Sequence, residues 1–264
     1  MRLFFACAVA AAGLAFAATS SAALPRITQY DALLVSRTDP ASLLLGTQNG
    51  LFRSRDGGRS WSAAGLAGDA VTSLAQVGTT ILAGGHGLLV ASGNGGRTWR
   101  SVRPSGLPNQ QVDALGSSGS TVYVVLTGAG LYRSLDNART FSSVSLAVGP
   151  AIRALALSGE QIVAGDVSSG VYLSPNGRDW KHTARGAIMA LAVGGEHRHG
   201  VLAASWGIAR SSDGGRRWST ALHSHVRFGA VAWAPGHPSL AYAVADDRSF
   251  WRSTDAGQSW HRLG

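Results

Sequence analysis

A short motif of serine, an acid or amide, glycine and an aromatic residue recurs six times along this chain of 264 residues. Its first copy reads Ser54-Arg-Asp56-Gly-Gly58-Arg-Ser-Trp61. The leading serines follow one another at intervals of about 40 residues: Ser54, Ser92, Ser134, Ser174, Ser211 and Ser253. A period held over six copies indicates a repeat protein built from structural units of that length.

Each period has the pattern of four short strands separated by turns. In the second period these segments are Val71 to Val77, Thr80 to Ala83, Gly87 to Ser92 and Trp99 to Val102, and none has helical spacing. The 35 glycines also disfavour a helical bundle, because glycine is about 1 kcal/mol worse than alanine in a helix. Four-stranded units of this length are typical of propeller blades. We therefore predict an all-β fold, a six-bladed β-propeller of antiparallel blades.

The motif fits a tight turn between strands three and four of each blade. An Asp or Asn side chain there can accept hydrogen bonds from backbone N–H groups of its own turn, and the glycines allow positive φ. The Trp or Phe would anchor the turn on the blade. We expect a structural role for Asp56, Asn94, Asp136, Asn176, Asp213 and Asp255. Ala138 in place of glycine, and a missing residue in the fourth copy, mark the least regular turns.

The N-terminus has the three-part plan of a secretory signal peptide. Arg2 precedes the apolar stretch Leu3 to Ala18, and small residues follow up to Ala23. The apolar stretch is shorter than the roughly 20 residues of a spanning helix, although an uncleaved anchor is the alternative. We predict a signal peptide over 1–23, a single propeller domain over 24–264, and a secreted or periplasmic protein with no membrane insertion after cleavage. Cys7, the only cysteine, lies inside the signal peptide.

The net charge of +9 could favour nucleic acid, anionic glycans or membrane headgroups. Many of the arginines, however, recur once per period in the motif itself: Arg59, Arg97, Arg139, Arg178 and Arg216. They would be spread around the outer rim of a ring rather than lining a groove, and no aromatic residues are interleaved for base stacking. We therefore predict no nucleic-acid partner.

The motif Ser-x-Asp-x-Gly-x-x-Trp resembles the Asp-box, or bacterial neuraminidase repeat, over essentially all of residues 27–264. Sialidases, sortilin-type receptors, some secreted glycosidases and photosystem II assembly factors share this repeat. The strand leading into the motif is also similar, as in Gly50-Leu-Phe-Arg-Ser54 and Gly130-Leu-Tyr-Arg-Ser134. The resemblance implies the propeller fold and says little about chemistry, because fold does not fix function.

The resemblance also implies where a site would lie, namely at the mouth of the central channel, on the face opposite the Asp-box turns. That face carries the starts of the innermost strands, the loops between strands two and three, and the links between blades. The candidate binding residues at this mouth are Asp31, Asp113, Arg153, Arg185, Trp206, His223, His225, Arg227, Asp246 and Asp247. A solvated loop face without a ligand is the alternative. Asp113 and Arg153 begin innermost strands of neighbouring blades, so we expect them to pair.

Catalytic residues are harder to find. Sialidase chemistry requires an arginine triad, a Tyr/Glu pair and an Asp acid, but the only glutamates, Glu160 and Glu196, fall in turns on the Asp-box face. Other glycoside hydrolysis needs two carboxyl groups about 5–5.5 Å or 6.5–9.5 Å apart, for which Asp31 and Asp113 are the first-strand pair. We assign no catalytic residue.

Metal and cofactor sites are not predicted either. His223 and His225 could form part of a metal site with Asp246, but they lie in polar loops, and there is no calcium loop or phosphate loop. The sequence thus favours an exported, non-catalytic propeller, a monomer, which presents a protein, peptide or glycan binding face at the channel mouth, as the photosystem assembly factors suggest. The alternative is a secreted glycoside hydrolase of sialidase-like type.

Overall fold

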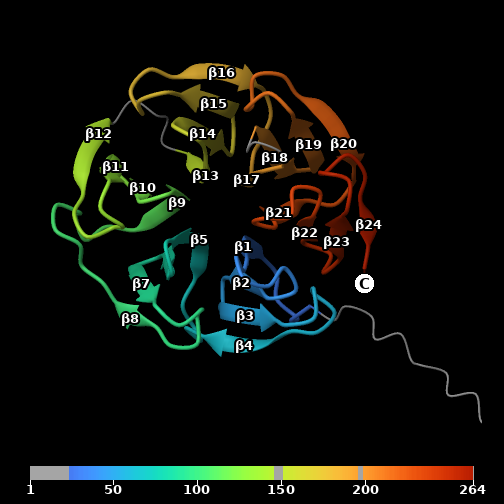
Figure 1. Ribbon diagram of the computed structural model, residues 1–264, viewed down its shortest axis with the longest axis horizontal. Coiled ribbons are helices and arrows are strands. Elements are labelled where there is room, and N and C mark those ends of the chain that lie inside the picture. Colours follow the sequence, from blue (N-terminus) through green and yellow to red (C-terminus); the bar gives the residue numbers. More distant parts are fainter. Residues whose placement is uncertain (1–23, 146–150, 196–198, 264) are drawn as a thin grey trace, which may run out of the picture.

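The computed structural model describes residues 24–145, 151–195 and 199–263, and within these ranges the chain forms strands and no helix. Six four-stranded antiparallel sheets surround a central channel (Figure 1). The predicted six-bladed propeller is therefore confirmed. The predicted signal peptide, residues 1–23, and Glu196 lie outside the described residues.

Each blade is formed by four consecutive strands, which pair in chain order from the channel to the rim. Blades one and two contain β1 (Tyr30–Val35), β2 (Leu43–Thr47), β3 (Gly50–Ser54), β4 (Ser62–Gly65), β5 (Val71–Val77), β6 (Thr80–Gly85), β7 (Leu88–Ser92) and β8 (Arg100–Ser101). Blades three and four contain β9 (Val112–Ser118), β10 (Thr121–Leu126), β11 (Gly130–Ser134), β12 (Ser142–Ser145), β13 (Ile152–Ser158), β14 (Gln161–Asp166), β15 (Gly170–Ser174) and β16 (Lys181–Ala184). Blades five and six contain β17 (Ala190–Gly194), β18 (Gly200–Ser205), β19 (Gly207–Ser211), β20 (Ser219–His223), β21 (Phe228–Trp233), β22 (Ala241–Ala245), β23 (Phe250–Ser253) and β24 (His261–Arg262).

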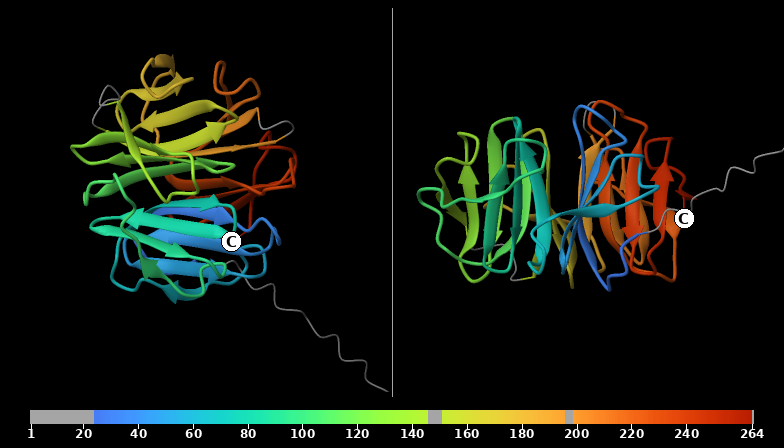
Figure 2. Two further views of the ribbon diagram at one scale, coloured as in Figure 1. Left: turned by 60° about the vertical axis from the view of Figure 1, so that its left-hand side comes forward. Right: turned by 90° about the horizontal axis from the view of Figure 1, so that it is seen from below.

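The ring closes by packing of the first blade against the last, without exchange of a strand between the chain ends. The innermost strands line the channel, and the strands run roughly along its axis when the ring is seen edge-on (Figure 2). At the closing seam, Gly229 of β21 lies so close to the Tyr30 carbonyl that a Cβ there would overlap it. Glycine at this position therefore allows blades one and six to meet.

The apolar core is divided into layers between neighbouring blades. The layer that closes the ring contains Leu33 and Leu45 from blade one together with Val244 and Phe250 from blade six, all buried. Each blade is too thin to bury both of its faces alone, so burial depends on its two neighbours. The propeller is consequently stabilised as a ring rather than blade by blade.

The Asp-box turns share one hydrogen-bond pattern, which the fifth blade illustrates. Oδ1 of Asp213 accepts hydrogen bonds from the backbone N–H groups of Arg216 and Arg217, at 3.0 and 2.9 Å. The Ser211 hydroxyl donates to the same carboxylate at 2.9 Å and accepts the N–H of Gly215 at 2.8 Å. The indole of Trp218 also donates to the Gly215 carbonyl at 2.9 Å, a bond that the indoles of Trp99 and Trp260 do not make.

Two turns differ from the others. In the third blade, Asn137 and Ala138 occupy the left-handed region at φ 61° and 65°, where the other copies mostly have glycine. In the fourth blade the turn is one residue shorter, and Gly177 donates its N–H to Ser174 three residues away instead of four. Of the two turns singled out from the sequence, the fourth thus has a distinct geometry, whereas the third keeps the shared hydrogen bonds with non-glycine residues.

Candidate functional site at the channel mouth

The channel mouth is a polar cavity of about 370 Å³ on the face opposite the Asp-box turns. It is lined by Gln29, Tyr30, Asp31, Gln48, Thr72, His86, Asp113, Arg153, Val167, Met189, Arg227 and Gly229. Most of these residues begin innermost strands, so the propeller geometry alone brings one side chain from each blade to the same place. Four of the ten candidates from the sequence, Asp31, Asp113, Arg153 and Arg227, line this cavity.

Asp113 is buried and held by three side chains. Its Oδ1 accepts hydrogen bonds from Gln111 and Arg153, both at 3.2 Å, and its Oδ2 accepts one from Thr127 at 2.8 Å. The expected pair across the seam between blades three and four is therefore present. The two partners differ in exposure, because the side chain of Asp113 is 9% exposed and that of Arg153 is 47% exposed.

Asp31 holds the equivalent position in the first blade but forms no ion pair with any residue that the structure describes. Gln29 and Gln48 donate to its two oxygens, each at 2.8 Å. Burial raises the pKa of Asp31 above its usual value, although the two glutamine hydrogen bonds and the charge of Arg227 act in the opposite direction. Asp246, a second carboxylate nearby, raises it further.

Asp246 and Arg227 form the second ion pair of the mouth, with Nε and Oδ2 2.6 Å apart. The backbone N–H of Asp246 also donates to the Arg227 carbonyl at 2.9 Å, which fixes the two segments to each other. Oδ1 of Asp246 is buried and has no hydrogen-bond partner among the described residues. Nη1 of Arg227 lies 3.9 Å from the sulfur of Met189 in the neighbouring blade.

The other candidates lie outside the cavity. Arg185 and His225 are exposed in the links that follow the outer strands, and His223 is exposed at the end of β20. Trp206, in the loop between β18 and β19, is 66% exposed. Asp247 accepts hydrogen bonds from the N–H and hydroxyl of Ser249 and thereby shapes its own turn. Among the described residues, no group of three or more His, Cys, Asp or Glu side chains is placed to hold a metal ion.

Gln29 was not among the sequence candidates, although the sequence does contain a signal for it. Gln29-Tyr-Asp31-Ala-Leu and Gln111-Val-Asp113-Ala-Leu are the same pattern in blades one and three. In both, the glutamine two residues before the aspartate donates to its carboxylate. The repeat therefore conserves a polar clamp at two positions around the mouth.

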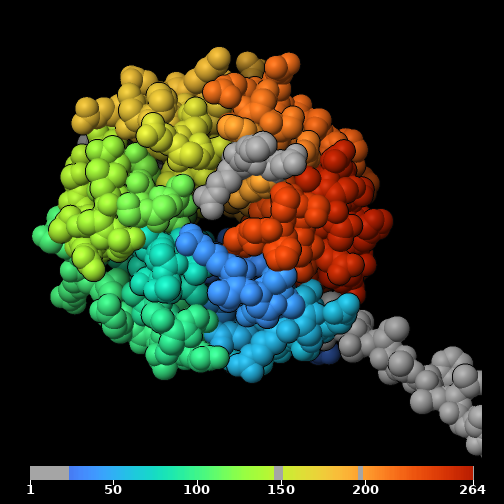
Figure 3. All heavy atoms as spheres, in the orientation of Figure 1, coloured from blue at the N-terminus to red at the C-terminus, as the bar shows by residue number. Residues whose placement is uncertain are grey.

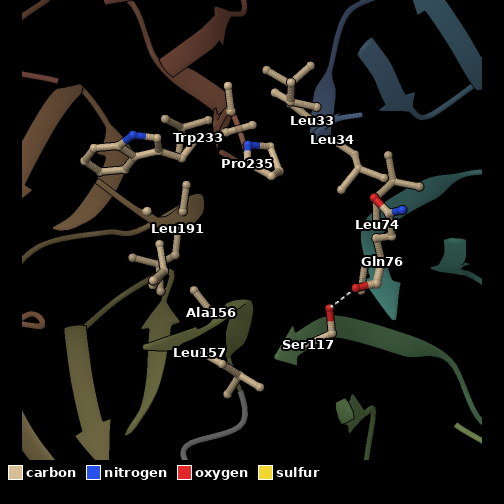
Figure 4. Close-up of a pocket in the computed structure, with 18 of the residues that line it drawn as sticks. Leu33, Leu34, Leu74, Gln76, Ser117, Ala156, Leu157, Leu191, Trp233 and Pro235 are labelled. Atoms are coloured by element: carbon tan, nitrogen blue, oxygen red, sulfur yellow. Dashed lines mark hydrogen bonds between the residues drawn. The ribbon is translucent and has the colours of Figure 1, made fainter. Parts of the chain in front are cut away.

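The opposite end of the channel is apolar in its deeper part. It forms a cavity of about 410 Å³ lined mainly by Leu33, Leu74, Leu157, Leu191 and Trp233, as Figure 4 shows. The hydroxyl of Ser117 donates to the Gln76 carbonyl there at 2.8 Å. A hollow at the centre of the ring is visible in the space-filling view (Figure 3). Within the channel, charged side chains are thus more numerous at the mouth than at this end.

None of the described segments is a helix of the length and apolarity that crossing a bilayer requires. This finding is limited to residues 24–145, 151–195 and 199–263.

Comparisons with known proteins identify the family. A family model described as photosynthesis system II assembly factor YCF48 matches residues 26–263. The structure of YCF48 from Cyanidioschyzon merolae is similar at 16% identity and a TM-score of 0.55, covering 92% of this chain and 87% of that one. A structure of YCF48 bound to D1 peptide is similar at 20% identity and a TM-score of 0.57, covering 90% and 82%.

A GH74 xyloglucanase from Xanthomonas campestris is similar at 19% identity and a TM-score of 0.57, but only 47% of that chain is covered. At such identities the solved structures show the fold alone. Among curated proteins, none matches this chain. The family model, by contrast, spans nearly the whole propeller, and so the chain belongs to the photosynthesis system II assembly factor YCF48 family.

Proposed function

We propose that this protein is an exported, non-catalytic propeller whose channel mouth binds a protein or peptide partner through an anionic group. Membership of the YCF48 family supports a binding function. A YCF48 structure at 20% identity is described as bound to D1 peptide, which supports a peptide as the class of ligand.

The observation that carries the proposal is the state of Arg153. Its Nη1 holds Asp113, while no further hydrogen bond to a described residue is found for its other nitrogens. The side chain is 47% exposed and borders the cavity of about 370 Å³. A guanidinium offers its N–H groups as a planar fork that matches a carboxylate. Arg153 is thus anchored on one side and able to donate on the other.

The carboxylates of the mouth are bonded to neighbouring side chains of the protein, an arrangement that favours a binding protein over a hydrolase. Asp113 accepts three hydrogen bonds, and both oxygens of Asp31 accept from glutamines. Asp246 is paired with Arg227. A glycosidase needs one carboxyl group as proton donor and another as nucleophile or base, each directed at the substrate. The likeness to the GH74 enzyme is one of fold alone.

A peptide array tests the proposal. Synthetic peptides that contain Asp, Glu or a free C-terminal carboxylate are compared with counterparts in which these groups are amides. We expect wild-type protein to prefer the acidic set and the Arg153→Ala variant to lose that preference. Arg139→Ala, which removes one exposed arginine from the Asp-box face, should behave as wild type. Equal binding of both peptide sets by the wild type would contradict the proposal.

Export has its own test. Leu24, the first described residue, is buried in the layer that also contains Tyr30, and the Tyr30 hydroxyl donates to the Pro25 carbonyl at 2.6 Å. The residue directly after the predicted cleavage site is thus packed into the propeller. Intact-mass measurement of the protein recovered outside the cytoplasm should give a chain that starts at Ala23 or Leu24. Recovery of the full-length chain in the cytoplasm would contradict export.

A further inference from the structure

A cleft rich in arginine lies at the seam between blades one and two, on the Asp-box side of the ring. Its volume is about 790 Å³. One wall is formed by the end of β3 and the loop after β1, and the other by the Asp-box turn of blade two. The arginines that line it are Arg37, Arg53, Arg55 and Arg97, whereas Asp39 is the only acidic residue in the lining.

The cluster arises because three repeat positions that meet at this seam all carry arginine. Arg53 and Arg55 flank the motif serine of blade one, and Arg97 belongs to the motif of blade two. In the next seam the corresponding residues are Ala91, Gly93 and Arg139. Between blades four and five they are Leu173, Pro175 and Arg216. Only the first seam carries arginine at all three positions, so the fold itself does not require this concentration of charge.

The backbone holds two of these side chains in place. Nη2 of Arg53 donates to the Gly95 carbonyl at 2.6 Å across the seam. Arg37 donates to the carbonyls of Gln76 and Gly78, at 2.9 and 3.2 Å. Both arginines therefore bridge blades one and two, and the acceptor of Arg53 is a neutral carbonyl that leaves its charge in place.

Three of the four arginines in the cleft have no acidic partner among the described residues. Arg53, Arg55 and Arg97 form no ion pair with a described residue. Oδ1 of Asp39 accepts the N–H of Ala41 and so belongs to its own turn. Burial lowers the pKa of Arg53, and the charges of Arg55 and Arg97 lower it further, which reflects the mutual repulsion of the three guanidinium groups. An anion in the cleft would relieve this repulsion.

We propose that this cleft binds a phosphate group. Guanidinium groups from two separate segments, the end of β3 and the Asp-box turn of blade two, line it, and those of Arg55 and Arg97 can each offer a planar fork of N–H donors. A carboxylate is satisfied by one such fork, whereas a phosphate carries more negative charge and more acceptor oxygens and can engage several. The phosphate would be free or carried by the headgroup of a lipid. The site is on the opposite side of the ring from the mouth and is independent of it.

The test uses inorganic phosphate and pyrophosphate, titrated into the full protein by calorimetry, together with vesicles of phosphatidylcholine alone or mixed with phosphatidic acid. The variant Arg55→Ala/Arg97→Ala removes two exposed guanidinium groups from the cleft. The control Arg139→Ala/Arg216→Ala removes the same charge from equivalent turns of blades three and five.

We expect saturable binding by wild type and control and at least tenfold weaker binding by the cleft variant. Binding to the soluble anions indicates free phosphate, and binding confined to vesicles with phosphatidic acid indicates a lipid headgroup. If the cleft variant and the control lose binding affinity equally, the effect comes from net charge alone and the proposed site is wrong. Binding of an acidic peptide such as oligoglutamate, with no response to any phosphate probe, would overturn the ligand class.

Discussion

Arg133 of blade three occupies the position that Arg53 occupies in blade one. Of these two arginines, Arg53 alone donates a hydrogen bond to an acceptor in the next blade. Arg53 donates to the carbonyl of Gly95, inside the Asp-box turn of blade two. Arg210 of blade five donates in the same way to Ala256 of blade six, at 2.7 Å. Nε of Arg133, in the blade that precedes the shortened turn of blade four, is buried without a partner among the described residues. The missing residue has removed the acceptor carbonyl.

This difference predicts that substitution by methionine changes the free energy of unfolding differently at the two positions. Arg210→Met should lower the free energy of unfolding by about 1–2 kcal/mol, since it deletes a hydrogen bond from a charged donor. Arg133→Met should leave it unchanged or raise it, because it removes a buried donor that lacks a partner. Urea unfolding of both variants measures the two values side by side. A larger loss for Arg133→Met than for Arg210→Met would show that Arg133 has a partner we have not identified.

Ala138 predicts a stabilising substitution. It lies at φ 65°, a conformation in which a Cβ is strained, so Ala138→Gly should raise the free energy of unfolding by about 0.5–1 kcal/mol. The matched control is Gly215→Ala, at φ 89°, where the added Cβ would also lie 3.0 Å from Leu173 Cδ2. That variant should be destabilised. Thermal unfolding of the pair checks both signs, and a lower melting temperature for Ala138→Gly would refute the strain argument.

We expect the Asp-box carboxylates to make the stability of the propeller sensitive to acid. Burial raises the pKa of Asp255, but hydrogen bonds from Ser259, Ser253 and Gln258 outweigh it and lower the pKa to about 2. An aspartate with a depressed folded pKa adds stability above about pH 4, its unfolded value, and this stability is lost as the pH falls toward 2. The pKa values of Asp56, Asp136 and Asp213 are lowered as well.

Blade two supplies the comparison, since Asn94 makes the same turn with an amide that donates to Thr98 at 2.8 Å. Asp255→Asn should therefore fold normally at pH 7 and show a shallower fall of melting temperature between pH 4 and pH 2. Asn94→Asp should show a steeper fall. Identical slopes for both variants and wild type would mean that these carboxylates do not govern acid unfolding.

The anchoring tryptophan and the aspartate of one turn should differ in their contributions to stability. Trp218 packs into the layer between blades four and five, so Trp218→Ala should cost about 3 kcal/mol. Asp213→Ala removes a cap for two N–H groups and should cost about 1 kcal/mol. Denaturant midpoints measure both. If Asp213→Ala abolished binding of a ligand at an unchanged melting temperature, the structural interpretation of the turn would be wrong.

The repeat period explains why so much of the fold could be predicted. One motif per blade gives the number of blades, and the complete strand sets at both ends of the repeat give the closure between β1 and β21. The pair of Arg153 and Asp113 could also be predicted, because equivalent first-strand positions meet around the channel.

Contacts across seams between non-equivalent positions could not be predicted. Arg227 meets Asp246 because a link between blades folds back on a loop of blade six, and nothing in the period fixes that approach. The arginine cleft likewise combines positions from two motifs and one loop, and its charge becomes evident only when the seam is assembled. The repeat period shows which residues occupy equivalent positions in different blades. Contacts between residues at non-equivalent positions depend on the lengths and directions of their side chains, which the period does not show.

The central claim, that the mouth is the partner site, is tested most directly by the double variant Arg153→Ala/Asp113→Ala. The measurement is its affinity for the acidic peptide selected on the array, taken together with its melting temperature. Removing both members leaves neither charge unpaired, so the propeller should remain folded. We predict at least tenfold weaker binding with a melting temperature close to that of wild type. Undiminished binding with a lowered melting temperature would show that the pair only plugs the channel and would contradict the account.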